Sequence, residues 1–137
     1  LVCTKEGGMR KTKKADNGKP TKSTISKELD KLWSLIVKQR DGFQCVVCGK
    51  DNTVAAHHIF SRKNHSTRWD IDNGVSLCFY HHMRWAHVEY EQFRDFIVGR
   101  IGKKMFETLK AQSARIEKYT IADLLDIRDK LKRMVDR

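Results

Sequence analysis

Apolar side chains recur at helical spacing in several stretches of the chain. The first stretch runs from Ser26, where that residue or a neighbour can supply an N-cap, to about Arg40; its apolar stripe consists of Leu29, Leu32, Trp33, Ile36 and Val37. Such a stripe is typical of a helix that buries one face in a core. The Asp41-Gly42 pair that follows predicts the end of this helix.

Helices are also predicted in the second half of the chain. A helical period begins near His81 and continues to Gly99, where the glycine interrupts it. Further helices are expected over residues 101 to about 110 and over residues 121 to about 135. The segment from Thr120 to Asp123 has the form of a capping box, which indicates where the last of these helices starts.

Two short segments have the composition of β-strands. Residues from Val54 to about Phe60 are mostly apolar or small, and a second strand is expected near residues 75–78. The polar stretch from Ser61 to Asp72 lies between them and predicts a loop. A strand, a loop, a strand and a helix, with further helices on both sides, indicate an α+β fold.

The length and the N-terminal composition predict the domain organisation. The chain has 137 residues, which is enough for one compact domain and too few for two ordinary ones. Residues 1–24 hold seven basic side chains against two acidic ones and show no apolar period, so we expect a flexible basic arm before a single domain over residues 25–137. The arm fits a solvated tail and a non-specific DNA tether equally well.

The overall charge favours a polyanionic partner. The 28 Lys and Arg residues against 17 Asp and Glu residues give a formal net charge of +11, and phosphate contacts release counterions. DNA is therefore the first candidate; anionic lipid is a weaker one, since we see neither a membrane span nor a lipidation signal. The N-terminal region has no apolar stretch of secretory length, so we expect a cytoplasmic protein.

Four side chains have the spacing of ligands in a structural zinc site. Cys45 and Cys48 form one pair, and Cys78 and His81 form a second pair with the same spacing. Thiolates and an imidazole suit a closed tetrahedral Zn²⁺ site. Cysteines buried as small apolar side chains are the competing interpretation, but the repeated spacing favours zinc. The remaining cysteine, Cys3, is expected to be a free thiol.

Two adjacent pairs of histidines indicate a second site. His57 and His58 lie on the first predicted strand, where neighbouring side chains face opposite ways, so at least one of them must act as a polar group. Neighbouring helical positions differ in direction by about 100 degrees. His81 can therefore face the zinc while His82 faces the predicted hairpin, which permits a polar site between the strand and the helix.

The segments around these histidines resemble a family of nucleases. Ala56-His-His-Ile-Phe60, Asn73-Gly-Val-Ser-Leu-Cys78 and His81-His82 are similar to the HNH endonucleases, also called His-Me finger nucleases, in their zinc-stabilised form. The resemblance covers residues 45 to 87. It implies a ββα-metal motif, a β-hairpin and a helix around one divalent ion, over residues 45–98, with C-terminal helices over residues 101–136.

A narrower resemblance connects the chain to small phage proteins. Three segments are similar to the NinG-type recombination endonucleases: Ser66-Thr-Arg-Trp-Asp70, Trp85-Ala-His87 and the start of the last helix at Thr120-Ile-Ala-Asp-Leu124. This resemblance implies a phage protein that processes DNA during recombination or packaging, and that works in the host cytoplasm.

The HNH resemblance implies a role for each residue of the motif. His58 matches the general base, which takes a proton from the attacking water, and an imidazole with a pKa of about 6.5 suits that task. His57 and His82 match the ligands of a catalytic Mg²⁺ or Mn²⁺ ion. Asn73 matches the residue that orients the base and holds the loop. An ion with two protein ligands keeps positions open for phosphate and water.

Two departures from the family pattern leave alternatives open. His81 stands where the family usually has a zinc-binding cysteine, so His81 and His82 could exchange their metals. His57 stands where the family often has an aspartate, so the roles of His57 and His58 could also be exchanged. A histidine in place of an aspartate shifts the metal preference toward softer transition metals.

The predicted function is a metal-dependent endonuclease that nicks or cuts DNA. Candidate DNA contacts are Arg62, Arg68, Arg84 and His87, with ordinary surface charges as the alternative. The competing hypothesis is a non-catalytic zinc-stabilised module that binds nucleic acid by charge. That hypothesis leaves most of the histidines without a role. The sequence predicts neither the form of the DNA substrate nor the oligomeric state.

Overall fold

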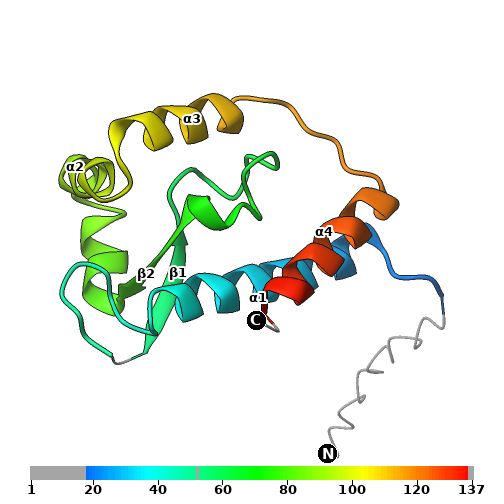
Figure 1. Ribbon diagram of the computed structural model, residues 1–137, viewed down its shortest axis with the longest axis horizontal. Coiled ribbons are helices and arrows are strands. Elements are labelled where there is room, and N and C mark those ends of the chain that lie inside the picture. Colours follow the sequence, from blue (N-terminus) through cyan, green and yellow to red (C-terminus); the bar gives the residue numbers. More distant parts are fainter. Residues whose placement is uncertain (1–17, 52, 136–137) are drawn as a thin grey trace, which may run out of the picture.

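The structure, a computed structural model, describes residues 18–51 and 53–135. In chain order its elements are α1 (Lys22–Arg40), β1 (Val54–His58), a 3-10 turn (Ile71–Asn73), β2 (Gly74–Cys78), a π-helical turn (His81–Trp85), α2 (Tyr90–Ile101), α3 (Lys103–Ser113) and α4 (Ile121–Val135). Figure 1 shows α4 lying beside α1 and α3 following α2 on the other side of the sheet. The α+β class expected from the sequence is confirmed.

The two faces of the small sheet pack on different helices. β1 and β2 pair antiparallel, with His58 opposite Gly74 and His57 opposite Val75. Gly74 faces the side chain of Trp33 on α1, whereas His57 packs edge-on against Phe93 on α2. The hairpin is therefore enclosed between the N-terminal helix and the helix that follows β2.

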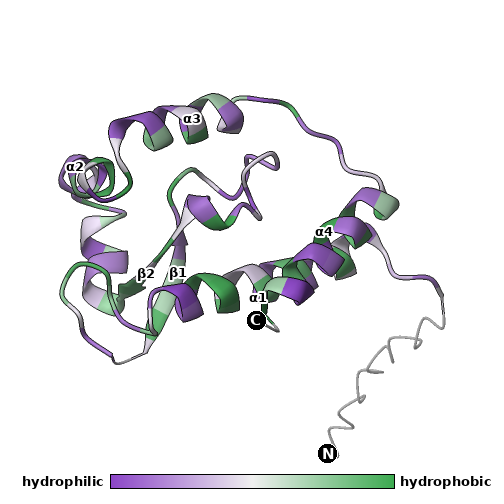
Figure 2. Ribbon diagram, in the orientation of Figure 1, coloured by the Kyte–Doolittle hydropathy of each residue, from purple (hydrophilic) through white to green (hydrophobic). Residues whose placement is uncertain are grey.

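Two hydrophobic cores lie on the two sides of the hairpin. The buried members of the α2-side core include Val75, Leu77, Phe93, Ile97, Phe106 and Leu109. The buried members of the α1-side core are Ile25, Leu29, Trp33, Ile36, Val37, Trp69, Leu124 and Leu131. Figure 2 shows apolar and polar positions mixed along α1 and α4, as expected for amphipathic helices that share one core.

Polar groups at the end of α1 cover the outer edge of β2. The carboxylate of Asp41 accepts a hydrogen bond from the amide of Ser76 at 2.8 Å, and the carbonyl of Ser76 accepts one from the amide of Val46 at 3.0 Å. Arg40 donates to the carbonyl oxygens of Gly74 at 2.6 Å and Ile71 at 2.8 Å. These bonds satisfy backbone groups that an open sheet edge would expose.

The helix predicted from His81 to Gly99 is wrong in two respects. The structure divides it into the π-helical turn at His81–Trp85 and helix α2, which begins only at Tyr90. Gly99 lies inside α2, because a single glycine weakens a helix without ending it. The helix ends instead at Ile101, and its C-cap is Gly102, whose φ of 87° is readily adopted by glycine. The next helix, α3, starts after this residue.

The other predicted elements differ from the observed ones by a few residues at their ends. Helix α1 starts at Lys22, within the predicted arm, because Thr21 and not Ser26 caps it by accepting a hydrogen bond from the amide of Thr24. Most of the arm, residues 1–17, lies outside the described residues. The capping box before α4 is confirmed by reciprocal hydrogen bonds between Thr120 and Asp123 of 2.8 and 3.1 Å.

The close approach of β2 to α1 makes Gly74 a sensitive position. A Cβ atom added there would lie 2.5 Å from a ring carbon of Trp33 and 2.7 Å from a methyl group of Val37. We expect Gly74→Ala to lower the free energy of unfolding by about 1–3 kcal/mol, as overpacking of a core does. Urea denaturation measures this change.

Gly99→Ala is the matched control for this substitution. A Cβ atom at Gly99 meets nothing within 4 Å, so we expect unchanged stability or a gain of about 0.5–1 kcal/mol from the improved helix propensity. A Gly74→Ala variant as stable as the parent protein would contradict the packing of β2 on α1.

Candidate metal centres

The four predicted zinc ligands lie together in the structure. The metal-binding atoms of Cys45, Cys48, Cys78 and His81 are all within 4.8 Å of one another. Cys78 Sγ is 3.2 Å from His81 Nδ1, and Cys48 Sγ is 3.8 Å from Cys78 Sγ. Zinc–sulfur bonds of about 2.3 Å place the sulfur atoms of a tetrahedral site about 3.8 Å apart. This cluster, the thiolate site, can therefore hold a zinc ion.

A tight turn positions the first two cysteines of the thiolate site. The amide of Cys45 donates to the carbonyl of Lys50 at 2.9 Å, and the amide of Gly49 donates to the carbonyl of Cys45 at 2.8 Å. Gly49 has a φ of 73°, which an L side chain rarely adopts. Burial raises the pKa of the Cys45 thiol, but hydrogen bonds from backbone amides outweigh burial and lower the pKa overall. The turn therefore favours a thiolate, the form that binds metal.

A second cluster consists of three histidines. The ring nitrogens of His57, His82 and His87 lie within 4.8 Å of one another. The ring centroid of His57 is 5.1 Å from that of His82 and 5.3 Å from that of His87, and the Nε2 atoms of His82 and His87 are 3.4 Å apart. We call this cluster the imidazole site. The sequence predicted His57 and His82 as its members, whereas His87 was predicted only as a DNA contact.

The π-helical turn explains why His87 joins the cluster. The amide of Ala86 donates to the carbonyl of His81 at 3.0 Å, five residues back, which is the hydrogen bond of a π-helix. In a regular α-helix, residues five positions apart differ in direction by about 140 degrees. The wider turn brings His82 and His87 together. Sequence periodicity missed His87 because a spacing of five is not an α-helical repeat.

Two histidines of the imidazole site, His57 and His82, favour their neutral forms. Burial lowers the pKa of His57 to about 3, with a further contribution from the positive charge that His82 and His87 can carry. Burial, followed by His87, also lowers the pKa of His82. A neutral imidazole offers a nitrogen lone pair, so these two side chains are ready to bind a metal at neutral pH.

His58 lies on the opposite face of β1 from His57. Its ring stacks on the indole of Trp33, with a centroid distance of 3.8 Å and an interplanar angle of 7°. Its Nε2 is 2.9 Å from the carbonyl oxygen of Arg68. Because a carbonyl can only accept, Nε2 carries the proton and Nδ1 keeps its lone pair in the neutral ring. Burial lowers the pKa of His58, which favours this neutral form.

The side chain of Asn73 joins the end of β1 to the following loop. Asn73 is fully buried; its Oδ1 accepts a hydrogen bond from the amide of Phe60 at 2.8 Å, and its Nδ2 donates to the carbonyls of Phe60 at 3.1 Å and Thr67 at 3.0 Å. Its amide makes no hydrogen bond to His58 among the described residues. Asn73 therefore holds the loop at Thr67, and the following residue, Arg68, contacts the His58 ring through its carbonyl.

The three predicted DNA-contacting arginines have different surroundings. Arg68 makes a bidentate contact with the carboxylate of Asp30 at 2.7 and 3.0 Å, and only 15% of its side chain is exposed. The side chains of Arg62 and Arg84 are 63% and 59% exposed and form longer ion pairs of 3.3 and 3.4 Å. Arg68 therefore anchors the loop to α1, while Arg62 and Arg84 present charge at the surface. Their contact with DNA stays a prediction.

Comparison with known proteins identifies the family. A family model described as the bacteriophage lambda NinG protein matches residues 4–137. The chain belongs to the NinG family. This membership confirms the resemblance to NinG-type phage proteins inferred from the sequence, whereas the endonuclease activity and the assignment to the HNH enzymes stay predictions. No curated protein and no solved structure matches the chain. Among the described residues, no helix has the length and apolar character needed to cross a membrane.

The thiolate site predicts a clear effect of removing one ligand. We expect Cys48→Ser to lose the bound zinc and to lower Tm by on the order of 10 °C, because zinc binding at such a site contributes folding free energy. Atomic absorption and thermal melting measure the two effects. Cys3→Ser removes a cysteine outside the thiolate site and should change neither quantity. Equal zinc content in the Cys48→Ser variant and the parent would exclude Cys48 as a ligand.

Proposed function

We propose that this protein is a metal-dependent endonuclease that hydrolyses DNA phosphodiester bonds in the manner of the HNH enzymes. The observation that carries this proposal is the imidazole site on one face of β1, together with His58, the next residue of the strand, on the other face. NinG family membership suggests a recombination-related function in a phage. Nicking or cutting of DNA during phage recombination or packaging agrees with both observations.

The imidazole site is the candidate catalytic metal centre. His57 comes from β1, while His82 and His87 come from the π-helical turn and the residues after it. These three side chains would hold a divalent ion, which would supply positive charge to offset the negative charge that develops at the scissile phosphate. The three side chains provide only neutral nitrogen donors, a set that suits Mn²⁺ and softer ions better than Mg²⁺.

His58 is the candidate general base. The Arg68 carbonyl fixes the proton on Nε2, so Nδ1 can accept a proton from water. The stacked Trp33 ring fixes the plane of the imidazole. Asn73 supports this arrangement through the loop, since it binds the carbonyl of Thr67, the residue before Arg68. The roles of positioning and of proton transfer are thus divided among different side chains.

The charge of the chain supports a DNA substrate. The net charge of +11 provides sequence-independent attraction to phosphates. Arg62, at the start of the loop after β1, and Arg84, in the π-helical turn, present exposed guanidinium groups. Contacts of this kind position a DNA backbone without reading its sequence.

The alternative is a zinc-stabilised module that binds nucleic acid without cleaving it. The thiolate site and the positive charge favour this alternative as much as they favour the enzyme. It gives no role to the imidazole site or to the fixed tautomer of His58. These two features are the reason why we prefer the endonuclease.

Replacing His58 tests the proposed chemistry. We expect His58→Gln to slow the conversion of supercoiled plasmid to nicked or linear DNA by about 10²–10⁴-fold, the usual contribution of a general base. The glutamine amide can still donate to the Arg68 carbonyl, so the loop should stay in place. Thermal melting and zinc content control for folding. Full activity in a folded His58→Gln variant would exclude His58 as the general base.

The metal preference provides a separate test of the imidazole site. We expect more cleavage with Mn²⁺ than with Mg²⁺, and no cleavage in excess chelator before metal is added back. His87→Ala should raise the Mn²⁺ concentration that gives half-maximal cleavage by about tenfold or more, since even indirect changes at metal sites cost 10–100-fold in affinity. Unchanged Mn²⁺ dependence in this variant would remove His87 from the ligand set.

A further inference from the structure

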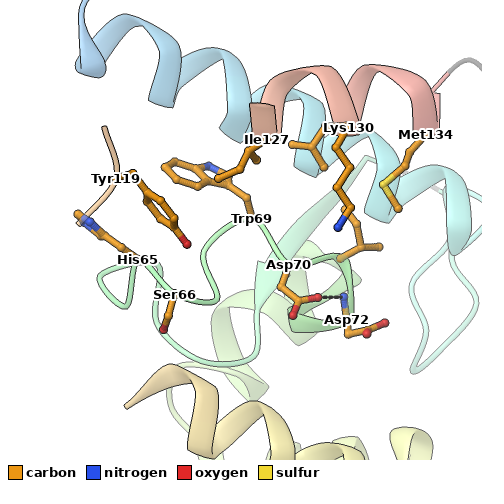
Figure 3. Close-up of a pocket in the computed structure, with 11 residues that line it drawn as sticks. His65, Ser66, Trp69, Asp70, Asp72, Tyr119, Ile127, Lys130 and Met134 are labelled. Carbon is orange, nitrogen blue, oxygen red and sulfur yellow. Dashed lines mark hydrogen bonds between the residues drawn. The ribbon is translucent and has the colours of Figure 1, made fainter. Parts of the chain in front are cut away.

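A pocket lies between the loop after β1, the segment before α4, and α4 itself. Its volume is about 420 Å³, within the range of about 300–1,000 Å³ that is usual for ligand sites. Figure 3 shows the rings of Trp69 and Tyr119 at one end and the side chains of Asp70 and Lys130 toward the other. None of these four residues belongs to the thiolate site or the imidazole site.

The aromatic end of the pocket is partly held in place by helix α1. The indole Nε1 of Trp69 donates to the carboxylate of Asp30 on α1 at 2.9 Å. Tyr119 is half-buried, and its ring centroid lies 5.9 Å from that of Trp69 at an interplanar angle of 47°. A tilted pair of rings beside an open volume offers an aromatic surface against which a flat ligand can pack.

The other end of the pocket offers hydrogen-bond acceptors. Oδ1 of Asp70 accepts a hydrogen bond from the amide of Asp72 at 2.9 Å, and its Oδ2 has no hydrogen-bond donor among the described residues. Asp72 places a second carboxylate beside it. Burial raises the pKa of Asp70 because the charged form is poorly solvated there. The positive charge of Lys130 acts on Asp70 from the same end and offsets one of the two carboxylates. The end stays net acidic, so it suits a ligand that donates hydrogen bonds better than it suits a phosphate.

We propose that this pocket binds a single unstacked DNA base that carries an exocyclic amino group. The base lies against Tyr119 and donates its amino hydrogens to the carboxylate of Asp70. Carboxylates accept from the amino group of cytosine, and aromatic side chains stack on any base. Thymine has no amino group and is the disfavoured base. The proposal rests on the proposed action on DNA and adds a base preference to it.

The position of the pocket along the chain connects it to the candidate catalytic residues. The carbonyl of Arg68 contacts His58, and the next two residues, Trp69 and Asp70, line the pocket. One loop therefore holds the candidate general base and forms the base pocket. A DNA strand that reaches His58 through a phosphate can place a nearby base against this loop.

Binding of short single strands tests the pocket without requiring cleavage. The probes are the trinucleotides d(TCT) and d(TTT), added to the full zinc-loaded chain with neither Mg²⁺ nor Mn²⁺ present. We expect d(TCT) to bind about tenfold more tightly than d(TTT), the scale of one good base contact. We also expect the indole N–H signal of Trp69 in the NMR spectrum to shift with d(TCT).

Two variants, each of which removes one negative charge, distinguish binding in the pocket from general electrostatic attraction to DNA. Asp70→Asn keeps a side chain that can cap the 3-10 turn, and it should reduce the preference for d(TCT) to less than about twofold. Asp129→Asn removes the same charge from an exposed position of α4 that does not line the pocket. It should keep the full preference.

The proposed base binding is rejected if both trinucleotides bind equally, if Asp70→Asn keeps the preference for d(TCT), or if the NMR signal of Trp69 does not shift. The outcomes for the pocket and for the endonuclease are independent. A base preference that depends on Asp70 in a protein without cleavage activity supports the pocket and rejects the endonuclease. Cleavage without any base preference rejects the pocket alone.

Discussion

Adjacent side chains on a β-strand must face opposite sides of the sheet, and this constraint at His57 and His58 organises the molecule. His57 faces α2 and packs against Phe93, while His58 faces α1 and stacks on Trp33. Each histidine therefore packs against the side chains of a different hydrophobic core. The proposed chemistry needs both, and the short hairpin keeps them in neighbouring positions on one rigid element.

The thiolate site supports this arrangement from the other end of the hairpin. Cys78 ends β2, and His81 begins the π-helical turn that carries His82. A metal bound by the thiolate site would join the turn at Cys45–Cys48 to both of these elements. His82 and His87 project from the turn that His81 anchors. Folding of the thiolate site and geometry of the imidazole site are thus physically coupled.

Much of the fold could be predicted from the sequence because its signals are local. The period of α1, the capping box of α4 and the paired spacing of the thiolate ligands each lie within a few residues. His87 could not be predicted as a member of the imidazole site, since its position depends on a π-helical turn that no repeat announces. The partners of Arg68 and Asn73 are equally hidden, because Asp30 and Phe60 come from other elements.

The base pocket, like the position of His87, could not be predicted from the sequence. Tyr119 comes from the segment before α4, while Trp69 and Asp70 come from a loop about 50 positions earlier in the chain. The packing of α4 on α1 and the hydrogen bond from Ser66 to the carbonyl of Gln112 at the end of α3 bring them together. The loop after β1 thus joins the candidate base to the pocket, and hydrogen bonds with Asp30, Asn73 and Gln112 fix this polar segment.

In the proposed arrangement the adjacent residues His81 and His82 serve different metals, and cobalt(II) titration of the metal-free protein distinguishes the two sites. We predict two classes of Co²⁺ site, of which only one shows the sulfur-to-cobalt charge-transfer absorption of a thiolate site. His81→Ala should weaken that class, and His82→Ala should weaken only the class without it. A single class of Co²⁺ site in the parent protein would contradict this arrangement. So would a His82→Ala variant that loses the charge-transfer absorption while the His81→Ala variant keeps it.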